Sequence, residues 1–199
     1  MTLRILIACA ALLGVACGKD TAGPEPIASG SATFGIPALG TRPPAIFSAA
    51  GAVELDAQGK GVPGTWAYAA IAPALGWPLD LYATMPSSNG LYHHMRIKLP
   101  RDVQAGTVLE ITPSACSHPD VTCAGFEFFL NTNLGNNLGD AYCRSVSGPV
   151  RVTARSDRRV AGTFRVPVTC AARPGDNLIY AVVEGSFDVP LVDITRFIS

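Results

Sequence analysis

Alternation of apolar and polar residues is the dominant pattern in the chain from about residue 45 onward. In 160–170 every second position is apolar or glycine, and 179–189 repeats this pattern after the turn-forming stretch 171–177. A period of two residues is typical of β-strands that turn one face toward a core and the other toward water. The two stretches therefore predict a pair of strands joined by a turn.

Further alternating segments occur at 46–55, 64–72, 79–85, 91–99, 107–112, 126–130 and 150–154, and none has a helical period longer than a turn or two. The 20 Gly and 16 Pro residues suit short strands separated by turns. These observations predict an all-β fold, an antiparallel β-sandwich of about 8–10 strands that forms a single domain over 45–199. A lipocalin-like closed β-barrel is the alternative.

The C-terminal strands share a Gly-x-Phe element on their inward faces, Gly162 with Phe164 and Gly185 with Phe187. A glycine leaves room for a ring to pack over the backbone of the neighbouring strand. We therefore expect cross-strand contacts between these glycines and rings. Pro167 lacks a backbone N–H, so it should mark an edge or a bulge.

The N-terminus has the features of an export signal. Arg4 is followed by an apolar run from Ile5 to Ala16, which is too short to span a bilayer as a helix. We expect residues 1–16 to be a signal peptide. The stretch 13–17, Leu-Gly-Val-Ala-Cys, resembles the lipobox of bacterial lipoproteins, although Gly14 stands where the family usually has leucine.

This resemblance implies that Cys17 is lipidated and that the lipid anchors the protein to a membrane. An ordinary signal peptide and a secreted, soluble protein are the alternative. Residues 17–44 are rich in Gly, Pro, Ala, Ser and Thr, so we predict a flexible tether there, although Phe34 and Ile36 could form an irregular first strand.

A signal that ends in cysteine, a polar tether and the strand pair GTFRVPV…EGSFDVPL together look like small bacterial lipoproteins of uncharacterised function with a β-sandwich domain. The resemblance implies a place in the bacterial cell envelope, lipid-anchored at the outer membrane or the cell surface. It implies no catalytic residues.

Six cysteines are present, and Cys9 and Cys17 belong to the signal and the lipobox. An even number remains, which in an exported protein indicates disulfides. Three pairings are possible, and we favour one within a short loop and one between two strands: Cys116 with Cys123, and Cys143 with Cys170. A zinc site is the rival, but the CxxC spacing of such sites is missing.

The charge balance bears on partners. The chain has 15 Lys+Arg and 15 Asp+Glu, without a basic run. Phosphate contacts need clustered cations, so nucleic acid is not an expected partner. We expect no cofactor and no resident metal, and leave open a protein or glycan partner beside the membrane.

Two histidine-containing segments are candidate sites. His93 and His94 are adjacent on a strand and so point to opposite faces. His94 shares the outward face with Arg96, which could contact an anion. His118 and Asp120 lie near Ser114 and Ser117, a combination that would suit a small hydrolase, but no G-x-S-x-G motif is present.

The remaining candidates for ligand contact are oxygen-rich or aromatic. Asn133, Asn137 and Asp140 lie in the Asn/Gly loop 131–140, which could bind calcium or a glycan. Trp66 and Tyr68 share one strand face, where exposed rings could hold a sugar; Trp77 and Tyr82 follow. The sequence therefore favours a non-catalytic binding or structural module over a hydrolase or a calcium- or glycan-binding module.

Overall fold

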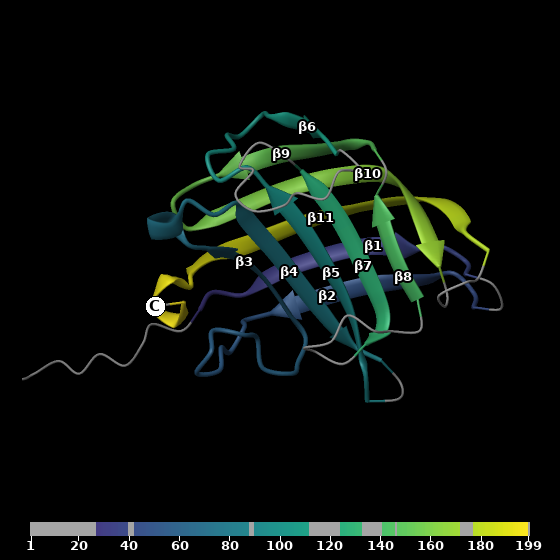
Figure 1. Cartoon of the computed structure of the whole chain (residues 1–199), viewed down its shortest axis with the longest axis horizontal. Coiled ribbons are helices and arrows are strands. Elements are labelled where there is room, and N and C mark those ends of the chain that lie inside the picture. Colours follow the sequence, from purple (N-terminus) through teal and green to yellow (C-terminus); the bar gives the residue numbers. More distant parts are fainter. Residues whose placement is uncertain are drawn as a thin grey trace, which may run out of the picture.

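The computed structural model describes residues 27–39, 42–87, 90–111, 124–132, 141–145, 147–171 and 177–198. These residues form strands and two short 3-10 helices, η1 (Pro73–Leu75) and η2 (Thr195–Phe197) (Figure 1). The strands are β1 (Gly30–Ile36), β2 (Ala45–Gly51), β3 (Trp66–Ile71), β4 (Leu79–Pro86), β5 (Tyr92–Leu99), β6 (Val108–Glu110), β7 (Gly125–Thr132), β8 (Ala141–Ser145), β9 (Pro149–Arg155), β10 (Arg159–Ala171) and β11 (Ile179–Asp193).

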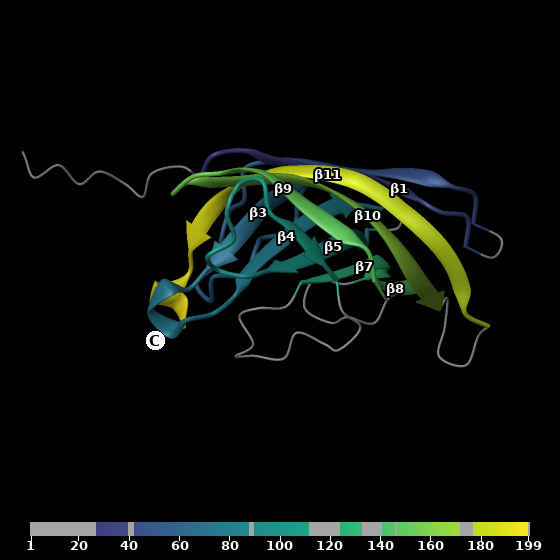
Figure 2. The same ribbon diagram turned by 90° about the horizontal axis from the view of Figure 1, so that it is seen from above.

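The strands form two layers (Figure 2). One layer has the order β2-β1-β11-β10-β9-β6, and the other has the order β3-β4-β5-β7-β8. Period-two alternation places apolar side chains between the layers, where they form one large core. The predicted all-β, sandwich-like fold is confirmed.

The layers are hydrogen-bonded to each other at two junctions. β10 pairs with β8 through Cys170 and Cys143, and β11 pairs with β3 through 191–193 and 69–71. The pairings therefore run in a closed circuit, β11-β3-β4-β5-β7-β8-β10-β11, as in the predicted alternative. The β11–β3 pair is parallel in an otherwise antiparallel set of strand pairings, and 11 strands are described where about 8–10 were expected.

The range predicted as a tether, 17–44, includes residues that belong to the folded domain. Residues 30–36 form β1 between β2 and β11, and Phe34 lies at the centre of the core. Its ring centroid is 4.6 Å from that of Phe47 and 5.3 Å from that of Phe128. Ala32, Phe34 and Ile36 alternate with small polar residues or glycine, and burial of this face outweighs the low overall hydrophobicity of the segment.

The Gly-x-Phe elements pack as expected. Gly162 lies directly opposite Phe187 across β10 and β11, and Phe164 lies opposite Gly185. A Cβ atom at Gly162 would lie 2.5 Å from the Phe187 ring, and one at Gly185 would lie 2.7 Å from the Phe164 ring. Each ring therefore occupies the space that a side chain on the opposite strand would need.

Pro167 lies in the part of β10 between its pairings with β9 (160–164) and β8 (168–171). Only β11 pairs with the strand there, which agrees with the expected edge position.

One of the two predicted disulfides lies within the described residues. Cys143 and Cys170 are directly opposite each other on β8 and β10, fully buried and bonded to each other. The predicted bond therefore ties the two layers at one junction. Cys116 and Cys123 lie outside the described residues.

No helix in the described ranges is both long and apolar enough to cross a membrane.

Candidate functional site

β3 is buried on both faces. Ala67 and Ala69 turn toward the core between the layers and are fully buried. Trp66 and Tyr68 turn to the outer face, yet only 6% and 4% of their surfaces are exposed. They form a second apolar cluster with Val53, Ala70 and Val192. The prediction that Trp66 and Tyr68 could form an exposed sugar platform is therefore wrong, because other segments cover them.

A short hairpin, residues 54–62, provides part of this cover. The Val62 N–H donates to the Glu54 carbonyl at 2.8 Å, and Leu55 and Gly61 form a bridge. One carboxylate oxygen of Asp56 accepts the backbone N–H groups of Gln58 and Lys60, both at 2.9 Å. This local carboxylate contact fixes the turn.

The hairpin packs tightly on the outer aromatic cluster. A Cβ atom at Gly61 would lie 2.1 Å from the Trp66 ring, and one at Gly59 would lie 2.6 Å from the Phe197 ring. Glycine at both positions lets the hairpin backbone contact a ring directly. The hairpin is therefore held between β3 and the C-terminal segment.

The C-terminal segment forms the other cover. After β11 the Ile194 N–H donates to the Ile71 carbonyl at 2.9 Å, which holds the segment beside β3. Asp193 accepts the Thr195 N–H at 2.8 Å, and this hydrogen bonding with Thr195 lowers the pKa of the Asp193 carboxyl. η2 follows and contacts η1.

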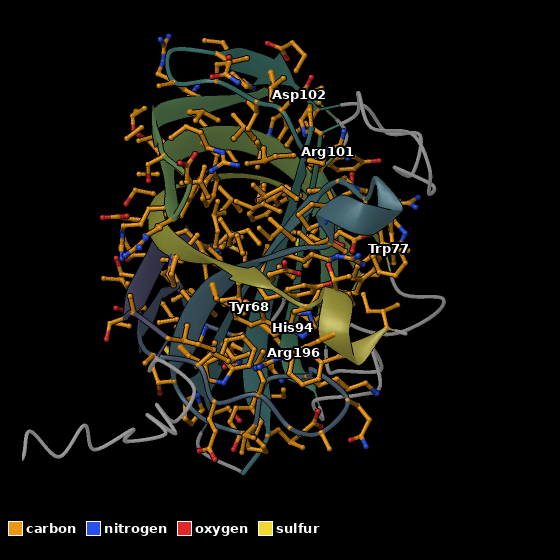
Figure 3. All side chains as sticks on the ribbon, turned by 90° about the vertical axis from the view of Figure 1, so that its left-hand side faces the viewer. Tyr68, Trp77, His94, Arg101, Asp102 and Arg196 are labelled. Atoms are coloured by element: carbon orange, nitrogen blue, oxygen red, sulfur yellow. A yellow bond between two sulfur atoms is a disulfide. The ribbon has the colours of Figure 1, made fainter. Side chains whose placement is uncertain are left out.

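A pocket of about 730 Å³ lies between the outer face of β3, β4 and β5 and these covering segments. This volume is within the range of small-molecule sites. Figure 3 shows Tyr68 and His94 beside η2, with Trp77 below η1. The aromatic residues that line the pocket are Trp66, Tyr68, Trp77, Tyr82 and His94.

Strand register places the lining residues in rows across the sheet. Trp66 is opposite Thr84, and Thr84 is opposite His94. In the next row Tyr68 is opposite Tyr82, and Tyr82 is opposite Arg96. Four predicted candidates, Trp66, Tyr68, His94 and Arg96, therefore lie in two neighbouring rows of one face, and the first three line the pocket.

The aromatic rings contact one another at an angle. The Trp66 and Tyr68 centroids are 5.2 Å apart with planes inclined by 54°, and the Tyr68 and Tyr82 centroids are 5.8 Å apart with planes inclined by 35°. Such tilted pairs are a favourable packing of aromatic quadrupoles. They give the pocket a continuous aromatic wall along β3 and β4.

Several polar groups around the pocket already have protein partners. The Trp66 indole N–H donates to the Val62 carbonyl at 2.7 Å, and the Thr84 hydroxyl donates to the Gly64 carbonyl at 2.7 Å. Arg96 donates two hydrogen bonds to Asp80, at 3.2 and 2.8 Å, and its guanidinium lies 5.4 Å from the Tyr82 ring centroid. The charges of Arg96 and Asp80 are thus paired.

His94 is neutral at neutral pH. Burial, with a further contribution from Arg96, lowers its pKa to about 4. Its Nδ1 atom is buried and has no hydrogen-bond partner among the described residues. Its ring packs against Phe129 with centroids 4.7 Å apart.

A proton on the Nδ1 atom of His94 would be a buried, unsatisfied donor, which is costly. The neutral tautomer with the proton on Nε2 is therefore favoured.

His93 lies on the opposite face of β5, as predicted, and its Nδ1 accepts the Asn131 N–H at 3.2 Å. Burial, with a further contribution from Arg42, lowers its pKa. The two adjacent histidines therefore lie in different environments on the two faces of β5.

The tyrosines of the pocket are also uncharged. Burial, then the nearby carboxylates of Asp80 and Asp56, raises the pKa of Tyr68 to about 12. Burial and Asp80 raise the pKa of Tyr82 further, and its hydroxyl donates to Asp80 at 3.4 Å. Both phenols therefore keep their proton at neutral pH, and that of Tyr82 is already used in the hydrogen bond to Asp80.

The other predicted site residues lie outside the described residues: Cys17, His118, Asp120, Asn133, Asn137 and Asp140. In the described part of the chain, no group of three or more His, Cys, Asp or Glu side chains is arranged to hold a metal ion.

The sequence patterns did not point to Asp56, Ile194 or Ile198 as pocket residues. The apolar C-terminal positions Ile194, Phe197 and Ile198 were the available signal, because a polar surface tail would not need them.

Comparisons of the chain with protein-family models, with curated proteins and with solved structures found no significant match.

Proposed function

We propose that this chain is an exported, non-catalytic binding protein that holds a small organic molecule in the pocket outside β3, β4 and β5. The observation that carries the proposal is the pocket itself, about 730 Å³ in volume, with Trp66, Tyr68 and Tyr82 in its wall. Concave, mostly apolar sites with a few polar groups are typical of small-molecule binding.

The surroundings of His94 support the proposal that the protein is non-catalytic. In a Ser-His-Asp arrangement a carboxylate accepts a hydrogen bond from one imidazole nitrogen and a hydroxyl meets the other. The Nδ1 atom of His94 has no partner within the described ranges, and the nearby Thr84 hydroxyl donates to Gly64. His94 thus lacks the orienting partner that a general base needs.

A lipid on Cys17 is the second part of the proposal, and the lipobox-like stretch 13–17 supports it. The ten residues that follow Cys17 span at most about 35 Å when extended. Ile27, the first described residue, packs against the cluster that contains Trp66. A lipid at Cys17 would therefore keep the pocket close to the membrane surface of the cell envelope.

Native mass spectrometry of the purified full chain tests the binding function. We expect a bound small molecule in the wild-type protein, or ligand-dependent mass shifts with a metabolite extract. Ile198 lines the pocket and is 37% exposed, so Ile198→Trp should block binding without disturbing the core. Ile46→Trp is the matched control, because Ile46 is 71% exposed on β2 and is not a pocket residue.

Equal ligand occupancy in Ile198→Trp, Ile46→Trp and wild type would contradict binding in this pocket. Absence of any bound or shifted species in all three would contradict the binding function.

A further inference from the structure

The chemical class of the ligand follows from the groups that line the pocket and from the hydrogen bonds and ion pairs that these groups already form within the protein. Three kinds of group line it: aromatic faces, aliphatic side chains at the C-terminal side, and a small number of polar atoms. Each kind limits the ligand in a different way.

The aromatic wall favours a flat ring. Trp66, Tyr68 and Tyr82 form a run of tilted rings across β3 and β4. A flat ring can pack against such a wall by offset stacking or by edge-to-face contact. Ile194 and Ile198 line the same pocket from the C-terminal segment, so apolar groups are present on two sides of it.

The charges on the strands beside the pocket are paired, and the other charges that line it belong to the hairpin 54–62. Arg96 is paired with Asp80 at 2.8 Å. One carboxylate oxygen of Asp56 accepts two backbone N–H groups of its own hairpin, and Lys60, which also lines the pocket, is exposed on that hairpin and forms no ion pair among the described residues. His94 and the two tyrosines are neutral. An ionic ligand held against the buried rings would lose its hydration without gaining an unpaired opposite charge there, which disfavours both anions and cations.

The polar atoms of the wall also limit how many hydroxyl groups a ligand could carry. The Trp66 N–H and the Thr84 hydroxyl are bonded to backbone carbonyls. A sugar would need a partner for each of its hydroxyls, because burying an unpaired polar group is costly. On the sheet side of the wall, the polar groups left without a partner among the described residues are the Tyr68 hydroxyl and the His94 ring, whereas Gln58 and Lys60 lie on the exposed hairpin; this favours a ligand with one or two polar groups.

His94 is the polar group best placed to recognise such a ligand. It lines the pocket from β5, between Thr84 on β4 and Phe129 on β7. Its buried Nδ1 has no partner in the described structure, so the proton belongs on Nε2. Nε2–H is then a neutral donor with a fixed direction, since the ring packs against Phe129.

We propose that the pocket binds an uncharged, flat-ring compound that carries one hydrogen-bond acceptor, and that the Nε2–H of His94 donates to this acceptor. This inference rests on the proposed function, because it specifies the ligand of the same pocket. The aromatic wall of β3 and β4 contacts the ring of the ligand, and His94 orients it.

Isothermal titration of the purified full chain with four probes tests the class. The probes are 2-naphthol, naphthalene-2-sulfonate, trimethyl(2-naphthyl)ammonium and methyl β-glucopyranoside, which represent a neutral ring, an anionic ring, a cationic ring and a sugar. We expect 2-naphthol to bind at least about tenfold more tightly than either charged analogue, because those lose hydration. The glucoside should not bind.

Two substitutions test the role of His94. His94→Phe keeps a ring but removes the donor, so the affinity for 2-naphthol should fall by about 3- to 10-fold. The affinity for naphthalene, which has no hydroxyl, should stay the same. His94→Gln restores a donor and should recover part of the 2-naphthol affinity. An equal loss for naphthalene and 2-naphthol would show that His94 only shapes the pocket and would overturn its role as donor.

The outcomes separate the ligand class from the binding function. Tighter binding of a charged probe or the glucoside, abolished by Ile198→Trp but not by Ile46→Trp, would overturn the class and leave pocket binding intact. If no probe binds but native mass spectrometry finds another molecule in the pocket, the class is also overturned. If no probe binds and native mass spectrometry finds no bound molecule, both the ligand class and the binding function are overturned.

Discussion

The indole nitrogen of Trp66 donates a 2.7 Å hydrogen bond to the carbonyl of Val62, four residues earlier in the chain. This bond ties the end of the covering hairpin to the first residue of β3. Gly61 lies against the same ring, so tightly that an added Cβ would meet it at 2.1 Å. The hairpin and the aromatic wall of the pocket therefore behave as one packed unit.

Gly61→Ala should disrupt the packing of the hairpin on the Trp66 ring. The new methyl group would overlap the Trp66 ring, so we expect the free energy of unfolding in urea to fall by about 1–3 kcal/mol. Gly35→Ala is the matched control, because a Cβ there has no heavy atom within 4 Å. Its stability should be unchanged or slightly higher, since alanine restricts the unfolded chain. Equal effects of the two substitutions would contradict the tight packing of Gly61 on Trp66.

The stability of the fold should depend on the protonation of His94. Its folded-state pKa of about 4 lies below the ordinary value of 6.5, so the unfolded chain binds the proton first as the pH falls. Stability is therefore complete above about pH 6.5 and declines toward pH 4, by on the order of 3 kcal/mol. Urea unfolding of wild type and His94→Gln at several pH values measures this difference.

The His94→Gln variant keeps His93 and all the carboxylates, so subtracting its pH profile isolates the contribution of His94. Parallel profiles of the two proteins between pH 6.5 and pH 4 would show that His94 is not buried as described.

The disulfide between Cys143 and Cys170 should stabilise the closed circuit of strands. It closes a loop with a sequence separation of 27 residues. On the chain-entropy model, replacing both cysteines with alanine lowers the free energy of unfolding by about 3.6 kcal/mol. Alkylation without reduction, followed by peptide mass spectrometry, should leave Cys143 and Cys170 unmodified. Alkylation of either residue in the folded, non-reduced protein would be incompatible with the bond.

The proposed anchor depends on a single side chain. In a bacterial host, the wild-type chain should be found in the membrane fraction, with an acylated Cys17 as its first residue. Cys17→Ala should lack the acyl groups and lose its membrane association, because diacylation supplies most of the membrane affinity. The fractionation is read together with intact-mass analysis. An unmodified Cys17 in the wild-type membrane fraction would refute the hypothesis that the protein is a lipoprotein.

The pairing of β10 with β11 was predictable from the sequence because a period of two residues is a local signal. The same alternation assigned Gly162 and Phe187 to the inward face, and the two Gly-x-Phe elements predicted rings packed over glycine; the register that places the two residues opposite each other came from the structure. The favoured pairing of Cys143 with Cys170 was one of three that the cysteine count allowed, and the strand that carries Cys143, β8, was not among the predicted segments.

The cover over β3 was not predictable in the same way. Alternation assigns Trp66 and Tyr68 to the face opposite the core. The apolar C-terminal residues indicate that 192–198 packs against the domain, but local sequence does not say that this segment and 54–62 cover that face. The C-terminal segment and β3 are distant in sequence, and the turn-rich stretch 54–62 has no period that would reveal its packing on β3. For β1 the sequence indicated only a possible irregular strand at Phe34 and Ile36 within the predicted tether, because its apolar positions are few and lie in a Gly- and Pro-rich segment.

The central claim is that a small ligand occupies the pocket outside β3, β4 and β5, and the two tryptophans allow a direct measurement. The chain contains only Trp66 and Trp77, and both line the pocket. A ¹H–¹⁵N NMR spectrum of the full chain therefore has two indole signals, which Trp66→Phe and Trp77→Phe assign. Titration with 2-naphthol should shift both signals with one dissociation constant. Binding of 2-naphthol that leaves both indole signals in place would contradict the account.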